Sequence, residues 1–207
     1  MNEVDAKTKI MDVALSLFAE KGFDGTTTRD IAAAASLNIS LISYYFGGKE
    51  GLYKAILENF AGHVKADMNK LIESFDKEDL SLEKIRDVIG AVVDRILDLR
   101  LTNPHIAQIM AREKLSGMPF SREIHEKMLF EVGEKLAGIL KKGQRTGLVR
   151  KDLNPYFYMC LLSESVMGYI LMHDCAQSLV ERCYLIPKER SEFKKQVISI
   201  FTEGILK

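Results

Sequence analysis

The stretch from residue 26 to residue 53 reads TTTRDIAAAASLNISLISYYFGGKEGLY and decides the fold. Thr27 is followed three residues later by Asp30, which is a capping-box pattern with Asp in the place of Glu and predicts the start of a helix. A short break follows that helix. Asn38 then predicts the N-cap of a second short helix over residues 39–45. Two short helices joined by a tight turn, with an amphipathic helix before them, indicate a helix-turn-helix.

The second short helix would present an unusual surface. Ile42 and Phe46 are spaced to point inward, which leaves the other uncharged and aromatic side chains largely outside. A helix in the major groove of DNA uses such groups, because serine hydroxyls bond base edges, aliphatic methyl groups contact thymine methyls and tyrosine hydroxyls reach phosphates. The alternative is that Tyr44 and Tyr45 are half-buried packing residues.

This stretch resembles the tetracycline-repressor (TetR) family of transcriptional regulators, and the resemblance covers about residues 6–60. In that family a T-[TS]-x-x-[ED]-I-A-x-x-A-G-V-[SN] helix and turn precede a recognition helix ending Y-x-[YH]-F or Y-[HY]-F, and the next helix starts [SG]-K-E-x-L. The sequence departs from this pattern at Ser36-Leu37, where Gly-Val is usual, and at Gly48, where Ser often caps the next helix. The matching positions are Thr26, Thr27, Ile31, Ala32, Ala35, Asn38, Tyr44, Phe46, Lys49, Glu50 and Leu52.

The resemblance implies a set of DNA-binding residues. Those expected at phosphates are Thr27, Thr28, Arg29, Tyr44, Tyr45 and Lys49. Those expected at base edges are Ile39, Ser40, Leu41 and Ser43, with Asn38 in the turn completing the set. Lys49 would hold its phosphate at the start of the next helix, helped by the helix dipole. The alternative for Arg29 and Lys49 is that each is a solvated surface charge.

The charge balance limits how such a protein could bind DNA. The chain has 207 residues with 29 Lys+Arg against 29 Asp+Glu, which argues against a protein that coats nucleic acid or a polybasic membrane binder. Residues 1–50 hold five Lys or Arg and seven Asp or Glu, so this module is not basic as a whole. We therefore expect Arg29 and Lys49 to face DNA while most acids lie on the far side.

The whole chain is expected to be all-α, with about nine helices, because apolar residues recur at helical spacing. We assign residues 1–50 to an N-terminal three-helix helix-turn-helix DNA-binding domain, which continues into a linking helix over 49–75. Residues 51–207 form the larger C-terminal helical ligand-binding and dimerisation domain. Gly22 is expected to end the first helix in a left-handed conformation. Asn103-Pro104 and Asn154-Pro155 each predict an N-cap before a helix that starts with Pro.

The location is expected to be a bacterial cytoplasm. The N-terminus has early acids and no apolar core of a signal peptide. The most apolar stretch, residues 155–172, has Ser163-Glu164-Ser165 at its centre, which favours a buried helix over a membrane span. Three cysteines without a C-x-x-C pair fit a reduced compartment better than disulfides or zinc.

A palindromic double-stranded DNA operator requires two recognition helices, and hence a homodimer. The last two helices, at about 155–179 and 188–206, are expected to form an intermolecular four-helix bundle, as in the family. The alternative is that they bury only intramolecular core. The expected interface residues are Leu162, Val166, Tyr169, Ile170, Phe193, Val197, Ile200 and Phe201.

The second domain is also expected to hold a small-molecule effector that is largely apolar. Methionine and aromatic residues gather between 110 and 172, and Met adapts to varied ligand shapes. Glu164 could pair with a cationic ligand. The alternative is that each Met fills core and that Glu164 hydrogen-bonds at the dimer seam. The expected ligand-binding residues are Met110, Met128, Phe130, Tyr158, Met159, Ser163, Glu164 and Met167.

These features predict a ligand-responsive transcriptional repressor that binds its operator as a dimer and is released when an effector shifts the linking helix. The alternative is a helical protein–protein interaction module without sequence-specific DNA binding. An enzyme is not expected, because the sequence has no Glu-x-x-His, H-E-x-x-H or G-x-S-x-G motif and no phosphate-binding glycine loop. We expect no catalytic residues, no metal and no cofactor.

Overall fold

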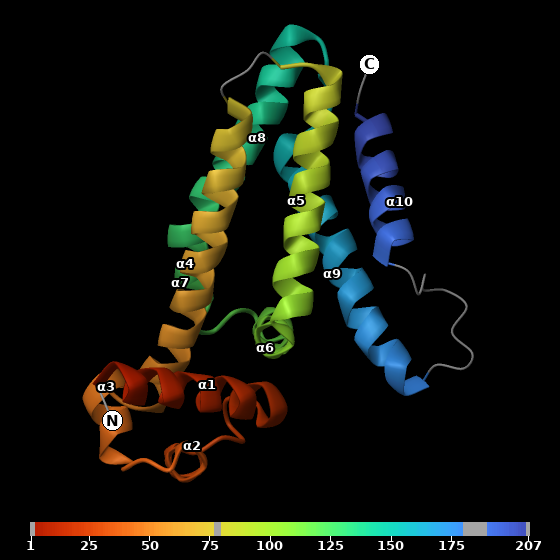
Figure 1. Ribbon diagram of the computed structural model, residues 1–207. Coiled ribbons are helices and arrows are strands. Elements are labelled where there is room, and N and C mark those ends of the chain that lie inside the picture. The colour runs from red at the N-terminus through yellow and green to blue at the C-terminus, as the bar shows by residue number, and fades with distance from the viewer. Residues whose placement is uncertain (1–2, 77–79, 180–189, 206–207) are drawn as a thin grey trace. The chain divides into compact units, whose positions relative to one another are not determined.

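The computed structural model describes residues 3–76, 80–179 and 190–205, and these residues form helices joined by loops (Figure 1). The all-α prediction is confirmed. The described helices are α1 (Glu3–Lys21), α2 (Thr28–Ala35), α3 (Ser40–Phe46), α4 (Lys49–Asp76), α5 (Leu82–Thr102), α6 (Pro104–Leu115), α7 (Arg122–Ile124), α8 (Phe130–Thr146), α9 (Pro155–Leu179) and α10 (Arg190–Glu203), with a π-helical segment at His125–Leu129. The described part has ten α-helices rather than about nine, because the π-helical segment separates α7 from α8. None of its helices is both long and apolar enough to cross a membrane.

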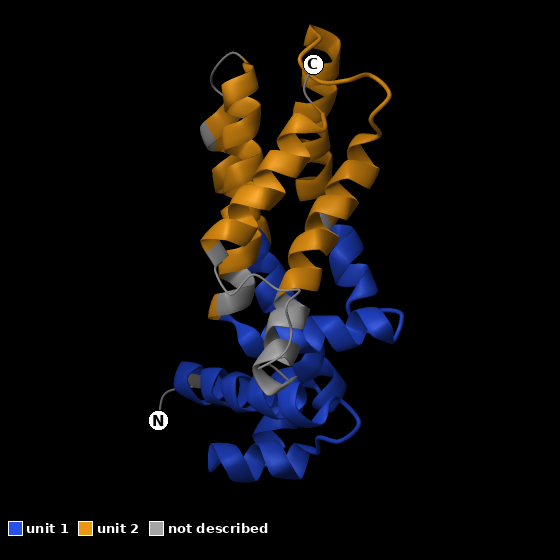
Figure 2. Ribbon diagram, turned by 90° about the vertical axis from the view of Figure 1, so that its right-hand side faces the viewer, with its two compact units in different colours: residues 1–64, 103–129 blue, residues 65–102, 130–207 orange. Residues whose placement is uncertain are grey.

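The chain divides into two compact units, drawn in blue and orange in Figure 2. Unit 1 holds residues 1–64 and 103–129, and unit 2 holds residues 65–102 and 130–207. This division differs from the domains expected from the sequence, which placed the only boundary at residue 50. The first half of α4 belongs to unit 1, and so do α6 and α7, which follow 40 residues later in the chain.

Unit 1 is built on one apolar core to which α1, α2, α3, α4 and α6 all contribute. Its fully buried side chains include Ile10, Phe18, Ile31, Ile42, Leu52 and Ile109. Ile106 and Ile109 of α6 lie in the same core as the helix-turn-helix, which explains why residues 103–129 belong to this unit. Gly22 has φ +78° and ends α1, as predicted, and Phe23 then stacks on Phe18.

The predicted helix starts have different outcomes. The capping box at Thr27 is confirmed, with both reciprocal hydrogen bonds present. The second short helix starts one residue later than predicted, at Ser40, so its N-cap is Ile39 and the prediction of Asn38 as the N-cap is wrong. Asn38 Oδ1 instead accepts from the Ser40 N–H at 2.9 Å in the turn before the helix. Asn154 caps α9 by accepting from the N–H of Tyr156, whereas Asn103 makes no side-chain cap at α6.

Unit 2 packs α5 against α9 and α10, and α8 against α9. Its buried side chains include Val92, Leu97, Leu136, Leu140, Leu162 and Val166. The second half of α4 buries Met68 and Ile72 and also forms ion pairs with these helices. Lys65 of α4 pairs with Glu131 of α8 at 2.6 Å, and Asp67 of α4 pairs with Arg95 of α5.

The turn between α2 and α3 strains the backbone. Ser36, at the C-terminal end of α2, has φ +54°, in the left-handed region where a Cβ is disfavoured. Ser36 stands where the family pattern has Gly. Because glycine adopts this conformation without steric cost, Ser36 holds a strain that glycine would remove.

We predict that Ser36→Gly raises the free energy of unfolding by about 0.5–1 kcal/mol, measured by urea denaturation of the full chain. Ala34→Gly, at an exposed helical position two residues away, is the matched control and should lower it by about 1 kcal/mol. A loss of stability in Ser36→Gly would contradict this account of the turn.

Candidate nucleic-acid interface

The exposed face of α3 carries uncharged and aromatic side chains, as the helical spacing predicts. Tyr44 is 75% exposed, and Ile39, Ser40 and Ser43 are also exposed. Leu41 and Tyr45 are half-buried and pack against the core of unit 1. The alternative of half-buried packing therefore describes Tyr45 but not Tyr44.

The start of α2 is held by a closed hydrogen-bond pair. The Thr27 hydroxyl donates to Asp30 Oδ2 at 2.7 Å and accepts from the Asp30 N–H at 3.1 Å. These bonds from Thr27, above all the one from its hydroxyl, lower the pKa of Asp30, so this acid is ionised beside the α2 N-terminus. Thr28 is half-buried, and the exposed Arg29 makes no ion pair within the described part of the chain.

Lys49 donates hydrogen bonds within unit 1, whereas the resemblance implies a contact with a DNA phosphate. Its ammonium group donates to the carbonyl oxygens of Phe23 at 2.9 Å and Thr26 at 3.1 Å, and it lies 4.2 Å from the centre of the Phe23 ring. Lys49 therefore joins the first turn of α4 to the loop between α1 and α2. These contacts use two of its three donor hydrogens, which leaves one for a phosphate.

Sequence reasoning missed a buried carboxylate in unit 1. Glu113 of α6 is 3% exposed, and its Oε2 accepts from the N–H groups of Phe120 at 3.1 Å and Ser121 at 2.9 Å. The Tyr53 hydroxyl of α4 donates to Glu113 Oε1 at 3.3 Å. Burial and the nearby carboxylate raise the pKa of Tyr53 well above its ordinary value, so the hydroxyl keeps its proton. No motif marks Glu113, because its partners are set by the fold.

The neighbouring Arg112 holds the end of α1. Its guanidinium donates to the carbonyl oxygens of Phe18 at 3.0 Å and Glu20 at 3.1 Å, in the last turn of that helix. The last carbonyls of a helix lack a partner within that helix, and the Phe18 oxygen also accepts from the N–H of Gly22, just after α1, at 3.0 Å. Arg112 and Glu113 thus bind α6 to α1 and α4 from adjacent positions.

The predicted ligand-binding residues do not form one group. Tyr158 and Met159 line an apolar cavity in unit 2, together with residues of α5 and α8 that include Val88 and Leu136. This cavity is small, with a volume of about 20 Å³. Phe130 and Glu164 are exposed on the surface, and Met110 lies in unit 1. Ser163 and Met167 do not line this cavity, and the side chain of Met128 lies outside the described residues.

Most of the predicted dimer residues are used inside one chain. Leu162, Val166, Tyr169 and Val197 are buried by contacts within unit 2, because the apolar stripes of α9 and α10 face α5 and each other. Phe193 stacks on Tyr169, and Phe201 contacts Tyr158 edge to face. Ile200 is exposed, and the side chain of Ile170 lies outside the described residues.

Comparison with known proteins identifies the family. The model of bacterial regulatory proteins of the tetR family matches residues 10–56, and that of the tetracyclin repressor-like C-terminal domain matches residues 83–200. The probable HTH-type transcriptional regulator YttP of Bacillus subtilis (strain 168) is 27% identical over 98% of this chain and 97% of its own. The HTH-type transcriptional repressor NicS of Pseudomonas putida is 30% identical over 71% of this chain and 67% of its own. The structure of FadR from Bacillus subtilis with stearoyl-CoA has a TM-score of 0.68 at 19% identity, covering 96% of this chain and 98% of that one.

The chain belongs to the TetR family, and the resemblance found in its sequence is confirmed. It is a transcriptional regulator with a DNA-binding helix-turn-helix in unit 1. The relatives that it matches are regulators rather than enzymes.

We predict that Glu113→Ala lowers the free energy of unfolding by roughly 2–4 kcal/mol, because it leaves the buried N–H of Ser121 and the part-buried N–H of Phe120 without an acceptor. Glu113→Gln keeps one oxygen for those groups and should lose about 1 kcal/mol. The measurement is urea denaturation, with Glu58→Ala, at an exposed position on α4, as the control expected to change stability by less than about 0.5 kcal/mol. Equal losses in Glu113→Ala and Glu58→Ala would show that the buried carboxylate does not stabilise unit 1.

Proposed function

We propose that this protein is a transcriptional repressor that binds a palindromic operator as a homodimer and leaves it when a small-molecule effector binds unit 2. The observation that supports this best is the face of α3, where Tyr44 is 75% exposed on a helix that ends in an aromatic cluster. An exposed, uncharged and partly aromatic helix face is unfavourable in water and suits the major groove.

In this proposal α3 contacts base edges in the major groove, and α2 contacts the phosphate backbone of the DNA. Ser40 and Ser43 would bond to bases, Ile39 would contact thymine methyl groups, and Tyr44 would reach a phosphate. Arg29 would supply the main positive charge from each subunit, because Lys49 is largely used within unit 1. With so few phosphates neutralised per subunit, affinity depends on using the site twice.

The homodimer would form through the outer face of α9 and α10, which includes Ile200 but not the buried residues named from the sequence. Phe157 and Leu161 lie one turn apart on α9 and are 71% and 62% exposed, and Ile200 of α10 is 65% exposed. Large apolar side chains exposed at helical spacing are typical of an interface. A second copy of the chain is the occupant that we propose, because a two-fold operator requires two reading heads.

The effector would bind against the apolar cavity between α5, α8 and α9. About 20 Å³ is room for a single water, so the cavity would have to enlarge around a ligand. The related fold of FadR is known with stearoyl-CoA, whose acyl chain is apolar. We therefore propose an effector with an apolar portion. α4 contributes residues to both units, so a shift of this helix on binding would weaken operator binding, and the operator would weaken effector binding by the same factor.

The protein–protein module remains the competing function, and selection of bound DNA from a random pool separates the two. The repressor requires recovery of a two-fold sequence, and that DNA then serves as the probe for metabolite titrations. Recovery of no preferred sequence would overturn the repressor proposal.

We predict that Arg29→Gln weakens binding to the selected operator several-fold. Binding to altered operator sequences should weaken by the same factor, because a contact with a phosphate does not distinguish one base from another. The slope of log affinity against log salt should fall by about 2 for the dimer, one for each lost contact. Fluorescence anisotropy between 50 and 200 mM salt measures both. The matched control is Arg86→Gln on the exposed face of α5 in unit 2. An unchanged salt slope in Arg29→Gln would remove Arg29 from the interface.

We predict that Leu161→Asp converts the dimer to a monomer, because it places two unpaired carboxylates in an apolar interface. Light scattering after gel filtration gives the mass, and operator affinity should fall at least 100-fold. Leu115→Asp, at a side chain that is 90% exposed in unit 1, is the control and should stay dimeric. A dimeric mass for Leu161→Asp would exclude this face.

A further inference from the structure

Ser40 of α3 has a hydroxyl group whose hydrogen is already used inside the protein. Its Oγ lies 2.8 Å from Asn38 Oδ1, and its backbone N–H donates to the same oxygen at 2.9 Å. The backbone bond fixes which end of the Asn38 amide faces Ser40, because an N–H can bond to the amide oxygen but not to the amide nitrogen. An amide oxygen carries no hydrogen, so Ser40 must be the donor in the bond between the two side chains.

These bonds limit what the two exposed side chains can do at the edge of a base. Ser40 Oγ keeps lone pairs but has no hydrogen left, so it can only accept a hydrogen bond from DNA. Asn38 Oδ1 has both of its lone pairs occupied. This blocks the bidentate contact by which an asparagine commonly recognises adenine.

Few other polar groups of this stretch are able to recognise a base. Residues 31–48 contain no Lys, Arg, Gln, Asp or Glu, so the commonest specific contact with guanine is not available from them. Ser43 is exposed, and its hydroxyl makes no hydrogen bond with any residue that the structure describes. That hydroxyl can either donate or accept, so it does not distinguish a donor from an acceptor on a base. Of the two serines, Ser40 is the one whose direction of hydrogen bonding is set by the fold.

This direction selects between two kinds of base. In the major groove adenine and cytosine present an amino group that donates, whereas guanine and thymine present a carbonyl oxygen that accepts. We propose that Ser40 accepts a hydrogen bond from the amino group of adenine or cytosine on the DNA strand that it faces. Adenine and cytosine then substitute for each other at this position, while guanine or thymine places a second acceptor against Ser40 Oγ. This inference rests on the proposed function, because it requires α3 to lie in the major groove.

The test begins with DNA selected from a random pool by the full-length protein and, separately, by Ser40→Ala. The base pair whose preference is lost in Ser40→Ala is the one that Ser40 contacts. Four duplexes, which carry each possible base pair at that position in one half-site, are then compared by fluorescence anisotropy. The parent should bind two of them, related by exchange of A and C on one strand, about 5-fold more tightly than the other two.

Two substitutions of Asn38 separate the direction of the hydrogen bond from the presence of a hydroxyl. Asn38→Ala releases the Ser40 hydrogen, so that Ser40 can donate or accept, and the four duplexes should then bind within about 2-fold of one another. Asn38→Asp keeps an oxygen that accepts from Ser40, so the parent's preference should remain. The added charge weakens binding to all four duplexes alike, because it acts on the phosphate backbone.

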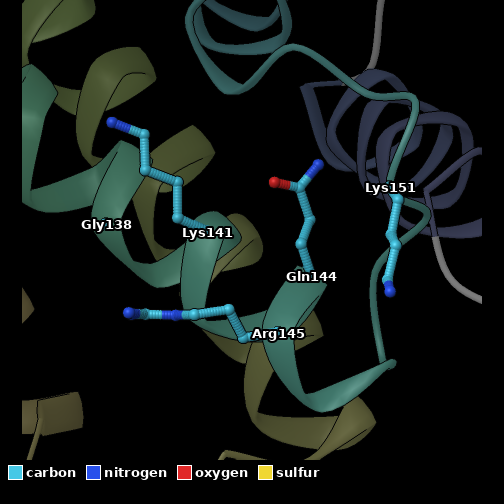
Figure 3. A pocket seen from close by; sticks show the side chains of 5 residues that line it. All are labelled: Gly138, Lys141, Gln144, Arg145 and Lys151. Carbon is cyan, nitrogen blue, oxygen red and sulfur yellow. The ribbon is translucent and has the colours of Figure 1, made fainter.

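Positive charge far from α3 in the sequence provides the matched control. Figure 3 shows Lys141, Arg145 and Lys151, which lie near the end of α8 and in the loop after it. Cations attract DNA whatever its sequence, so Arg145→Gln/Lys151→Gln should leave the ratio of affinities among the four duplexes unchanged. Ser43→Ala should likewise keep the preference at the base pair that Ser40 contacts.

The inference and the proposed function fail in different ways. If a two-fold sequence is selected but the parent groups A with G or A with T at this position, or prefers none of the four duplexes, the inference is wrong and the repressor stands. The same conclusion follows if Ser40→Ala loses no preference, or if Asn38→Ala keeps the preference of the parent. If the parent selects no sequence at all, both the repressor and the inference are wrong.

Discussion

The carboxylate of Glu113 constrains unit 1, because its hydrogen bonds join α6 to α4 and to the loop after α6. A buried carboxylate is costly unless its oxygens are satisfied, and here two backbone N–H groups and the Tyr53 hydroxyl satisfy them. This requirement fixes the loop after α6 and the first half of α4 to each other. With Arg112 on the end of α1, it makes residues 103–129 part of the unit that holds the helix-turn-helix.

The consequence for function is that three segments of the chain connect the DNA-reading unit to unit 2. The first lies within α4, which contributes to both units, the second is the step from α5 to α6, and the third is the run from the π-helical segment into α8. In the proposed mechanism an effector acts on α5, α8 and α9, and all three segments are then available to transmit the change. The apolar cavity uses α5 and α8, which adjoin the second and the third of these segments.

The distribution of charge limits how unit 1 can hold DNA. The helix-turn-helix is not basic as a whole, and Lys49 donates to backbone carbonyls within its own unit, so DNA would be held by few charges at fixed positions. Residues 141–151 hold five Lys or Arg and no Asp or Glu, and Arg150 pairs with Asp152. A neutral net charge thus covers different local balances of charge. This distribution suits a protein that binds DNA through a few placed contacts.

The sequence by itself determined the local structure. The capping box at Thr27, the left-handed Gly22 and the helical spacing of apolar residues are governed by neighbours within a few positions, so the helix-turn-helix, the all-α class and the family could be predicted. Tertiary structure alone decided which apolar faces meet. Leu162 and Val166 are as apolar as Leu161, but they face α5 and α8 within the chain while Leu161 is exposed. Periodicity shows that a helix has an apolar stripe, but not which neighbour covers it. The same holds for Glu113, whose partners lie 60 residues away or across a loop and are brought to it only by folding.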